Sequence, residues 1–173
     1  PLDRELAAAL GRPLRLANDA DCFALSEASD GAAAGAGVVF GVILGTGVGG
    51  GVVIDGRLLG GANAIAGEWG HNPLPWPRPE WGEVPGPTCW CGRAGCIESY
   101  LSGPGLTADH PDRTMSSREI VAASQGGDPV ARQAMARYED RLARALAHMI
   151  NILDPHVVVL GGGLSAIDSL YDA

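Results

Sequence analysis

The clearest pattern of apolar and polar positions lies in residues 128–154. Apolar side chains recur there at three- and four-residue spacing, which places them on one face of a helix. They are Val130, Ala134, Tyr138, Leu142, Ala145, Met149 and Leu153, with Arg141 beside Leu142. The pattern predicts one long helix that ends before Pro155, because proline cannot continue a helix.

Shorter segments also have helical patterns. Helices are expected over residues 3–11, 20–28 and 116–124, and another is expected to start at Leu164. Asn18 and Asp19 both precede the second of these, and either residue type can cap a helix N-terminus. The cap of that helix is therefore expected at one of these two positions.

Apolar runs rich in valine and isoleucine predict the strands. The strongest are residues 38–45, 51–56 and 156–160, and a short strand is expected over residues 14–17. The first two flank "TGVGG" and predict a hairpin with a glycine-rich tip. The mixture of helices and strands, without an internal repeat, indicates an α/β protein.

Residues 57–105 have little periodicity and many glycine, proline and tryptophan residues. They predict long loops with short strands. A loop of this length inside a domain is usually functional or held by additional contacts.

Composition and charge narrow the functional classes. The net charge is −8, which argues against a nucleic-acid partner, since phosphate binding requires clustered positive charge. All twelve basic residues are arginine, so mechanisms that need a lysine base, Schiff base or P-loop lysine are excluded. No apolar run has the length of a membrane span and no secretory signal is visible, so a cytoplasmic protein without a membrane partner is expected.

Three of the four cysteines lie close together as Cys89-x-Cys91-x4-Cys96, while Cys22 stands alone. Such short gaps suit metal ligands on tight turns better than a disulfide framework. Three cysteines and one histidine form a usual closed zinc site. His71, flanked by glycine in the same irregular region, is the preferred fourth ligand. The alternatives are His110, His148 and His156, or three cysteines that are simply buried or free.

Carboxylates and glycines supply further candidate chemistry. Asp19 follows a predicted strand and is either a general base toward a hydroxyl or a helix cap. Glu68 lies three residues before His71, and Glu98 lies two residues after Cys96, so a metal-bound turn would hold Glu98 firmly. The glycine segments 45–51 and 161–163 are either phosphate-binding turns or merely tight connections.

These motifs together resemble the ROK family of sugar kinases and sugar-responsive repressors. The matching segments are "NDAD", "GTGVGGG", "GEWGH", "CWCGRAGCIE" and "VVVLGGGLS", in the family's order. The cysteine segment fits the family signature CxCGxxGCxE at every fixed position. Within the family, the chain looks most like bacterial fructokinases of the mannokinase/fructokinase type, with N-acetylglucosamine kinases close behind.

The resemblance implies an actin-like, hexokinase-like ATPase fold of the ribonuclease H type. It implies that Asp19 is the catalytic base and that a structural Zn²⁺ and a Mg²⁺·ATP are bound. The residues that would bind sugar are Asn18, Asp19, Glu68, His71 and Glu98. The zinc ligands would be His71, Cys89, Cys91 and Cys96. The nucleotide would be bound by Gly45, Thr46, Gly47, Gly49, Gly161, Gly162 and Gly163.

The expected reaction is transfer of phosphate from ATP to the 6-hydroxyl of D-fructose. N-acetylglucosamine kinase and glucokinase are the alternatives within the family. A sugar-responsive repressor and a zinc-stabilised binding module without catalysis are the alternatives of other classes. A homodimer is also an expectation, since the family is often dimeric.

The family's first phosphate motif, Asp-x-Gly-Gly-Thr, does not occur in this sequence. Residues 1–20 are therefore expected to be the end of an N-terminal ATPase-like domain. Residues 21–173 are expected to form the C-terminal ROK domain, with a zinc-binding loop over residues 67–98. The chain is thus expected to be a C-terminal fragment whose own ATP binding and turnover are not assured.

Overall fold

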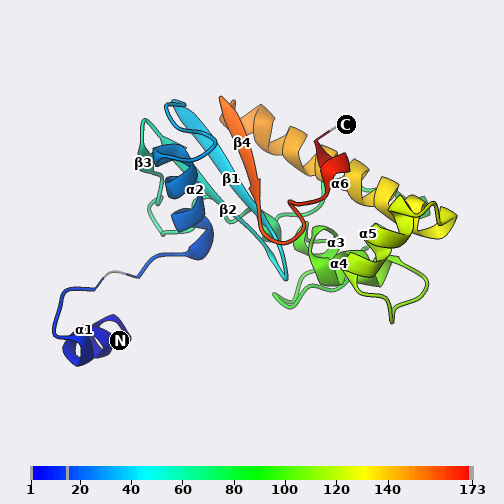
Figure 1. Ribbon diagram of the computed structural model, residues 1–173, viewed down its shortest axis with the longest axis horizontal. Coiled ribbons are helices and arrows are strands. Elements are labelled where there is room, and N and C mark those ends of the chain that lie inside the picture. Colours follow the sequence, from blue (N-terminus) through cyan, green and yellow to red (C-terminus); the bar gives the residue numbers. More distant parts are fainter. Residues whose placement is uncertain (1, 15, 172–173) are drawn as a thin grey trace.

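The computed structural model describes residues 2–14 and 16–171, and its centre is a mixed four-stranded sheet (Figure 1). The strand order is β3 (Arg57–Leu58), β2 (Val48–Ile54), β1 (Val38–Leu44) and β4 (Val157–Gly161). β1 pairs antiparallel with β2 and parallel with β4, and β2 pairs antiparallel with β3. The parallel pair requires a crossover, which the long helix α6 (Pro129–Leu153) supplies.

The two faces of the sheet are covered by different helices because β1 alternates its side chains. Phe40, Val42 and Leu44 belong to the large core that includes α6, whereas Val39 packs in a smaller core with Ala24. Ala24 lies on α2 (Asp19–Ser29), whose buried residues are all alanines. The sheet presents glycine to this helix: a Cβ on Gly41 would lie 2.6 Å from the Cβ of Ala24. Helix α2 therefore packs unusually close to the strands.

The long helix and the shorter helical segments surround the larger core. They are α3 (Glu98–Leu101), α4 (Gly103–Asp109), α5 (Ser117–Gln125) and the 3-10 helices Trp69–His71, Pro79–Trp81 and Asp168–Leu170. α6 ends before Pro155, as predicted, and it begins at an Asp128 cap. α5 begins with a capping box between Ser116 and Glu119. None of the described helices is long and apolar enough to cross a membrane.

Helix α1 (Leu2–Leu10) lies apart from the other described helices and strands (Figure 1). It confirms the predicted N-terminal helix, yet none of its residues is buried. The strand expected over residues 14–17 is wrong, because Leu14, Leu16 and Ala17 form no ladder. A strand requires a hydrogen-bonded neighbour, and no described strand lies beside these residues. The fourth residue, Arg15, lies outside the described ones.

Three other expectations about the elements need correction. β2 begins at Val48 and includes three glycines. Gly49 and Gly51 pack closely against α2, whereas Gly50 packs against Trp69 and Phe40 on the other face, and both contacts leave little room for a side chain. Within the segment expected to be loop, which ended at residue 105, α3 and the start of α4 are helical instead. The segment after Gly163 forms turns and the 3-10 helix Asp168–Leu170 instead of an α-helix. Residues 172–173 of that segment lie outside the described part of the chain.

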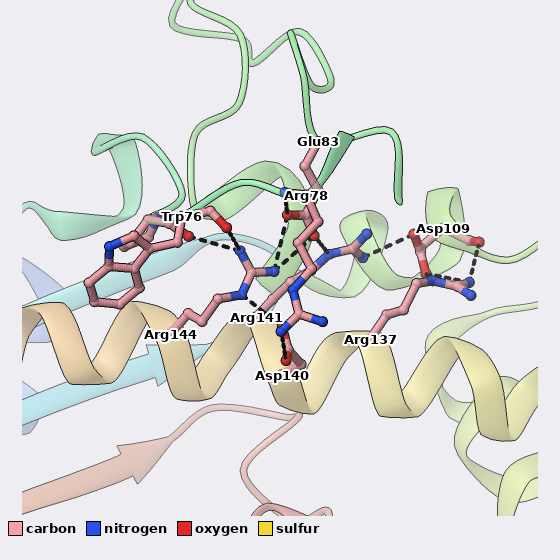
Figure 2. Close-up of polar contacts among 9 residues, drawn as sticks. Trp76, Arg78, Glu83, Asp109, Arg137, Asp140, Arg141 and Arg144 are labelled. Carbon is pink, nitrogen blue, oxygen red and sulfur yellow. Dashed lines mark hydrogen bonds and ion pairs between the residues drawn. The ribbon is translucent and has the colours of Figure 1, made fainter. Parts of the chain in front are cut away.

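Residues 59–97 contain no long regular element, in agreement with the prediction of a long loop. Two isolated bridges, Pro73 to Cys96 and Thr88 to Ala94, organise its second half. Two polar clusters also hold it: the metal cluster, defined as His71, Cys89, Cys91 and Cys96, and an ion-pair cluster around Glu83 (Figure 2). The loop is thus ordered by side chains more than by backbone ladders.

Candidate functional site

A polar cleft of about 480 Å³ lies where α2, the β1–β2 turn and the loop after β3 meet. Its lining includes every residue expected to bind sugar. These residues and their neighbours are Asn18, Asp19, Ile43, Gly45, Thr46, Gly47, Val48, Gly49, Glu68, His71, Trp90 and Glu98. The structure therefore brings together positions that are up to 80 residues apart in the sequence.

Asn18 and Asp19 enter the cleft at the start of α2. The side chain of Asn18 caps the helix by accepting hydrogen bonds from the N–H groups of Ala20 at 2.8 Å and Asp21 at 3.3 Å. The cap is thus Asn18, and Asp19 is the first residue of the helix. Because Asn18 is the cap, Asp19 is not required for capping and remains a candidate general base. Oδ1 of Asp19 also accepts a hydrogen bond from the N–H of Ala20.

Glu98 connects the cleft to the glycine turn and to the cysteine segment. Its Oε2 accepts a hydrogen bond from the backbone N–H of Val48 at 3.0 Å, and its Oε1 accepts one from Nε1 of Trp90 at 2.6 Å. A Cβ on Gly47 would lie 2.7 Å from Oε2, so a larger residue at that position would displace the carboxylate. Each carboxylate oxygen retains a second lone pair that can accept from a ligand hydroxyl.

The metal cluster beside the cleft has the geometry of a tetrahedral site. All four donor atoms lie within 4.8 Å of one another. Sγ of Cys91 and Sγ of Cys96 are 3.7 Å apart, and Sγ of Cys89 is 3.6 Å from Nδ1 of His71. Zinc–sulfur bonds of about 2.3 Å in a tetrahedron imply sulfur–sulfur edges of about 3.8 Å. The donors therefore fit a single zinc-sized ion.

The thiols of the metal cluster respond differently to their surroundings. Burial, reinforced by the neighbouring thiols, raises the pKa of Cys96 to about 12. A hydrogen bond from the backbone of Arg93 is the largest of the effects that lower the pKa of the exposed Cys91. Metal binding would displace the remaining thiol protons, since zinc binds the thiolate.

The other three histidines are engaged elsewhere. Nδ1 of His156 accepts a hydrogen bond from the N–H of Val38, His110 is buried against the backbone of Asp112, and His148 packs edge-on against Trp76. Among the described residues, His71 is the histidine that joins the three cysteines.

The four tryptophans have separate roles in this region. Trp69 is buried against Phe40 and donates a hydrogen bond to the carbonyl of Gly49, so it supports the glycine turn from below. Trp90 is 81% exposed, lies edge-on to His71 and lines the cleft. Trp76 and Trp81 lie beside the ion-pair cluster, Trp76 through its carbonyl and Trp81 through its ring.

A second cleft, of about 690 Å³, adjoins the first and shares Gly45 and Thr46 with it. Of the glycines 161–163, only Gly163 lines it. Gly162 has a φ of +87° and Gly161 packs against the ring of Phe23, so these two shape the turn. Arg113, Ser117 and Arg118 also line this cleft, and no sequence motif pointed to them.

The ROK family profile matches residues 1–173. The chain belongs to the ROK family. An N-acetyl-D-glucosamine kinase from Erwinia tasmaniensis is 47% identical over 176 residues, which cover 99% of this chain and 58% of that protein. The chain therefore spans less than two thirds of this relative's length.

Two solved ROK structures have the same fold as this chain. A ROK glucokinase from Streptomyces griseus, in complex with glucose and AMPPNP, matches with a TM-score of 0.83 and 28% identity, over 99% of this chain and 61% of that one. A ROK transcriptional regulator described as a homologue of the E. coli MLC protein matches with a TM-score of 0.82 and 29% identity, over 99% and 45%. The ROK fold and the actin-like, hexokinase-like class are thereby confirmed, and fold alone does not separate kinase from regulator.

Proposed function

We propose that this chain supplies the sugar cleft and one phosphate-binding turn of an ATP-dependent N-acetylglucosamine kinase. The observation that carries the proposal is the polar cleft, in which Asp19 lies with Asn18, Glu68 and Glu98 beside the turn Gly45–Gly49. Phosphoryl transfer requires an oriented hydroxyl, a base and donors for phosphate, and these residues are of the required types.

In the proposed reaction, Asp19 accepts the proton of the sugar's primary hydroxyl. The hydroxyl oxygen then bonds to the γ-phosphorus of ATP, the bond to the β-phosphate oxygen breaks, and ADP leaves. Asn18, Glu68, His71 and Glu98 orient the sugar through hydrogen bonds to its other hydroxyls. The backbone N–H groups of the Gly45–Gly49 turn stabilise the phosphate charge, and Mg²⁺ remains an expectation drawn from the family.

The choice of sugar changes from the initial expectation. Fructose is not supported, since the relative that is 47% identical is an N-acetyl-D-glucosamine kinase, which was the alternative. We therefore place N-acetylglucosamine first and glucose second in the proposal.

We also propose that the metal cluster holds a structural zinc ion. Four protein donors close a tetrahedral site and leave no position for a reacting group. Its function is then to fix the segment that carries Trp90 and Glu98 together with His71, which contacts Trp90. Zinc itself takes no part in the transfer.

Replacing Asp19 by asparagine tests the proposed base. In the whole protein that carries this chain, Asp19→Asn should lower kcat by about 10²–10⁴-fold and leave sugar binding nearly unchanged, because the side chain keeps its size but cannot accept the proton. Asp21→Asn is the matched control: it lies on the same helix, outside the cleft. Steady-state kinetics that show near-normal turnover for Asp19→Asn would contradict the role.

A panel of sugars tests the rest. ADP release measured with N-acetylglucosamine, glucose, mannose and fructose should give the highest kcat/KM for N-acetylglucosamine. A higher value for fructose would reverse the choice of sugar. No turnover with any sugar, combined with sugar-dependent DNA binding, would instead support the repressor alternative.

A further inference from the structure

A second group of unsatisfied polar atoms lies away from the polar cleft, beneath the loop that contains Glu83. A cavity of about 230 Å³ is formed there between this loop, the α3–α4 segment and α6. Three buried side-chain atoms lack a hydrogen-bond partner among the described residues: Oγ of Ser99, the hydroxyl of Tyr100 and Nη2 of Arg141. All three residues line this one cavity.

Arg141 is the central charge of the cavity. Its side chain is 1% exposed, and two of its three guanidinium nitrogens are paired, Nε with Glu83 at 2.7 Å and Nη1 with Asp109 at 2.9 Å (Figure 2). The guanidinium also lies over the ring of Tyr100, with 5.0 Å to its centroid. The remaining nitrogen can only donate hydrogen bonds, and leaving a buried charged donor unsatisfied is costly.

The charges around the cavity favour an anion over water. The ion-pair cluster around Glu83, from here on called the arginine cluster, contains four cations and three carboxylates. They are Arg78, Arg137, Arg141 and Arg144 with Glu83, Asp109 and Asp140. Arg113 lines the cavity as a further cation, and no carboxylate in the described part of the chain pairs with it. Of these charged residues, Asp109, Arg113 and Arg141 line the cavity itself, so its wall carries two cations and one carboxylate in a chain whose net charge is −8.

The hydroxyls complete a set of donors. Burial, helped by the nearby Glu83 carboxylate, raises the pKa of Tyr100 to about 12, so its hydroxyl keeps its proton near neutral pH. The Ser99 hydroxyl rotates to donate or accept as needed. Exposed residues, including Gly82, Pro87 and Arg113, form the rim, so the cavity is reached from solvent.

We propose that this cavity binds a small inorganic oxyanion of the phosphate or sulfate kind. Nη2 of Arg141 and the hydroxyls of Ser99 and Tyr100 donate to it, and Arg113 closes the rim. The volume is below the roughly 300 Å³ at which pockets accept drug-sized ligands, which matches a small ion and not a sugar phosphate. Ala108 and Arg113 line both this cavity and the second cleft, so the ion would lie next to a cleft that contains Gly45, Thr46 and Gly163 of the residues expected to bind nucleotide.

The test measures thermal unfolding of this chain in inorganic phosphate, with chloride at equal ionic strength as reference. A bound ion raises Tm in a concentration-dependent way, from which Kd follows. Tyr100→Phe and Ser99→Ala remove hydroxyls that have no partner in the protein, so these variants should fold, and each should weaken phosphate binding about 10-fold or more. Tyr138→Phe is the matched control, since its buried hydroxyl bonds to the carbonyl of Leu101 and lies outside the cavity.

The outcomes separate the sites. Thr46→Ala alters the glycine turn and should leave the phosphate response of the cavity intact. A phosphate response that is absent in the unmodified chain, or that is equal in the unmodified chain and Tyr100→Phe, would overturn the proposal and indicate a cavity that holds only water. In crystals soaked with selenate, an anomalous peak is expected within hydrogen-bond distance of Nη2 of Arg141, and a peak only at the Gly45–Gly49 turn would contradict it.

Discussion

The metal cluster and the arginine cluster hold the same loop in contrasting ways. The metal cluster lies at the edge of the polar cleft and includes an exposed thiol, Cys91. The arginine cluster is built on α6, and its central pair, Glu83 and Arg141, is almost fully buried (Figure 2). The first joins four donors from residues 71–96, whereas the second joins the loop to a helix about 60 residues later.

The difference is one of reversibility and of position. The contribution of a metal cluster depends on its bound ion, so a chelator can remove it. Buried ion pairs are permanent in the folded state, and they connect the loop to the core that α6 shares with the sheet. The contrast predicts that disturbing the first changes the residues of the cleft as well as stability, while disturbing the second changes mainly stability.

Of the changes considered, loss of the metal should have the largest effect, and it should act on the segment from residue 71 to 98. Cys96→Ser, or removal of metal by a chelator, should lower the free energy of unfolding by roughly 5 kcal/mol or more, because closed zinc sites contribute directly to folding. Metal analysis together with chemical denaturation measures both parts of the prediction. Cys22→Ser, an exposed cysteine outside the cluster, should change neither. A chelator that strips the metal without lowering Tm would show that the metal is not structural.

Removal of the central carboxylate should rank next. Glu83→Gln keeps the size of the side chain but leaves Arg141 and Arg144 without their shared partner, and breaking a buried pair costs about 3–5 kcal/mol. Equilibrium denaturation of the domain measures the loss. Glu80→Gln lies three residues earlier on the exposed side of the same loop and should be within about 0.5 kcal/mol of the unmodified chain. Equal losses for the two variants would show that the buried ion pairs of Glu83 contribute no more than an exposed carboxylate.

The same carboxylate predicts a dependence on pH. Burial alone would raise the pKa of Glu83, but hydrogen bonds from Arg144, Arg141 and the backbone of Arg78 outweigh it and lower the pKa below the usual 4.5. A lowered folded-state pKa means that this contribution is complete above the unfolded-state pKa and is lost as pH falls through the folded-state pKa. The stability difference between the unmodified chain and Glu83→Gln should therefore be constant near neutral pH and shrink in acid. A difference that grew on acidification would contradict the assigned pairing.

The smallest effect is expected where the metal cluster meets the cleft. Trp90→Phe keeps an aromatic ring beside His71 but removes the N–H that Trp90 donates to Glu98. Because the side chain is 81% exposed, stability should change by no more than about 0.5 kcal/mol. The KM for sugar should rise several-fold, because one hydrogen bond to a charged group no longer orients Glu98. Kinetics in the whole protein that show an unchanged KM would separate Trp90 from the proposed site.

Local patterns in the sequence predicted much of the fold and most of the candidate site. The spacing of apolar residues located α6, and the cap and proline at its ends set its limits because these effects act within one helical turn. The gaps between Cys89, Cys91 and Cys96 indicated a metal site, since ligands on tight turns are close in sequence. His71 could be predicted as the fourth ligand because glycine precedes it and because it lies in the same loop as the cysteines.

The tertiary structure decided the features that depend on residues far apart in the chain. No local signal joined Glu83 to Arg141, which lies within the apolar pattern of α6 as an apparent exception. The strand expected over residues 14–17 failed because a strand depends on a neighbour, and α4 was missed because its sequence "GPGLTAD" is rich in turn residues. The cavity beside Arg141 exists only after the loop, α3–α4 and α6 are packed together. By itself the sequence determined the elements and the nearby ligands, whereas long-range packing decided which charges are buried and which donors remain unpaired.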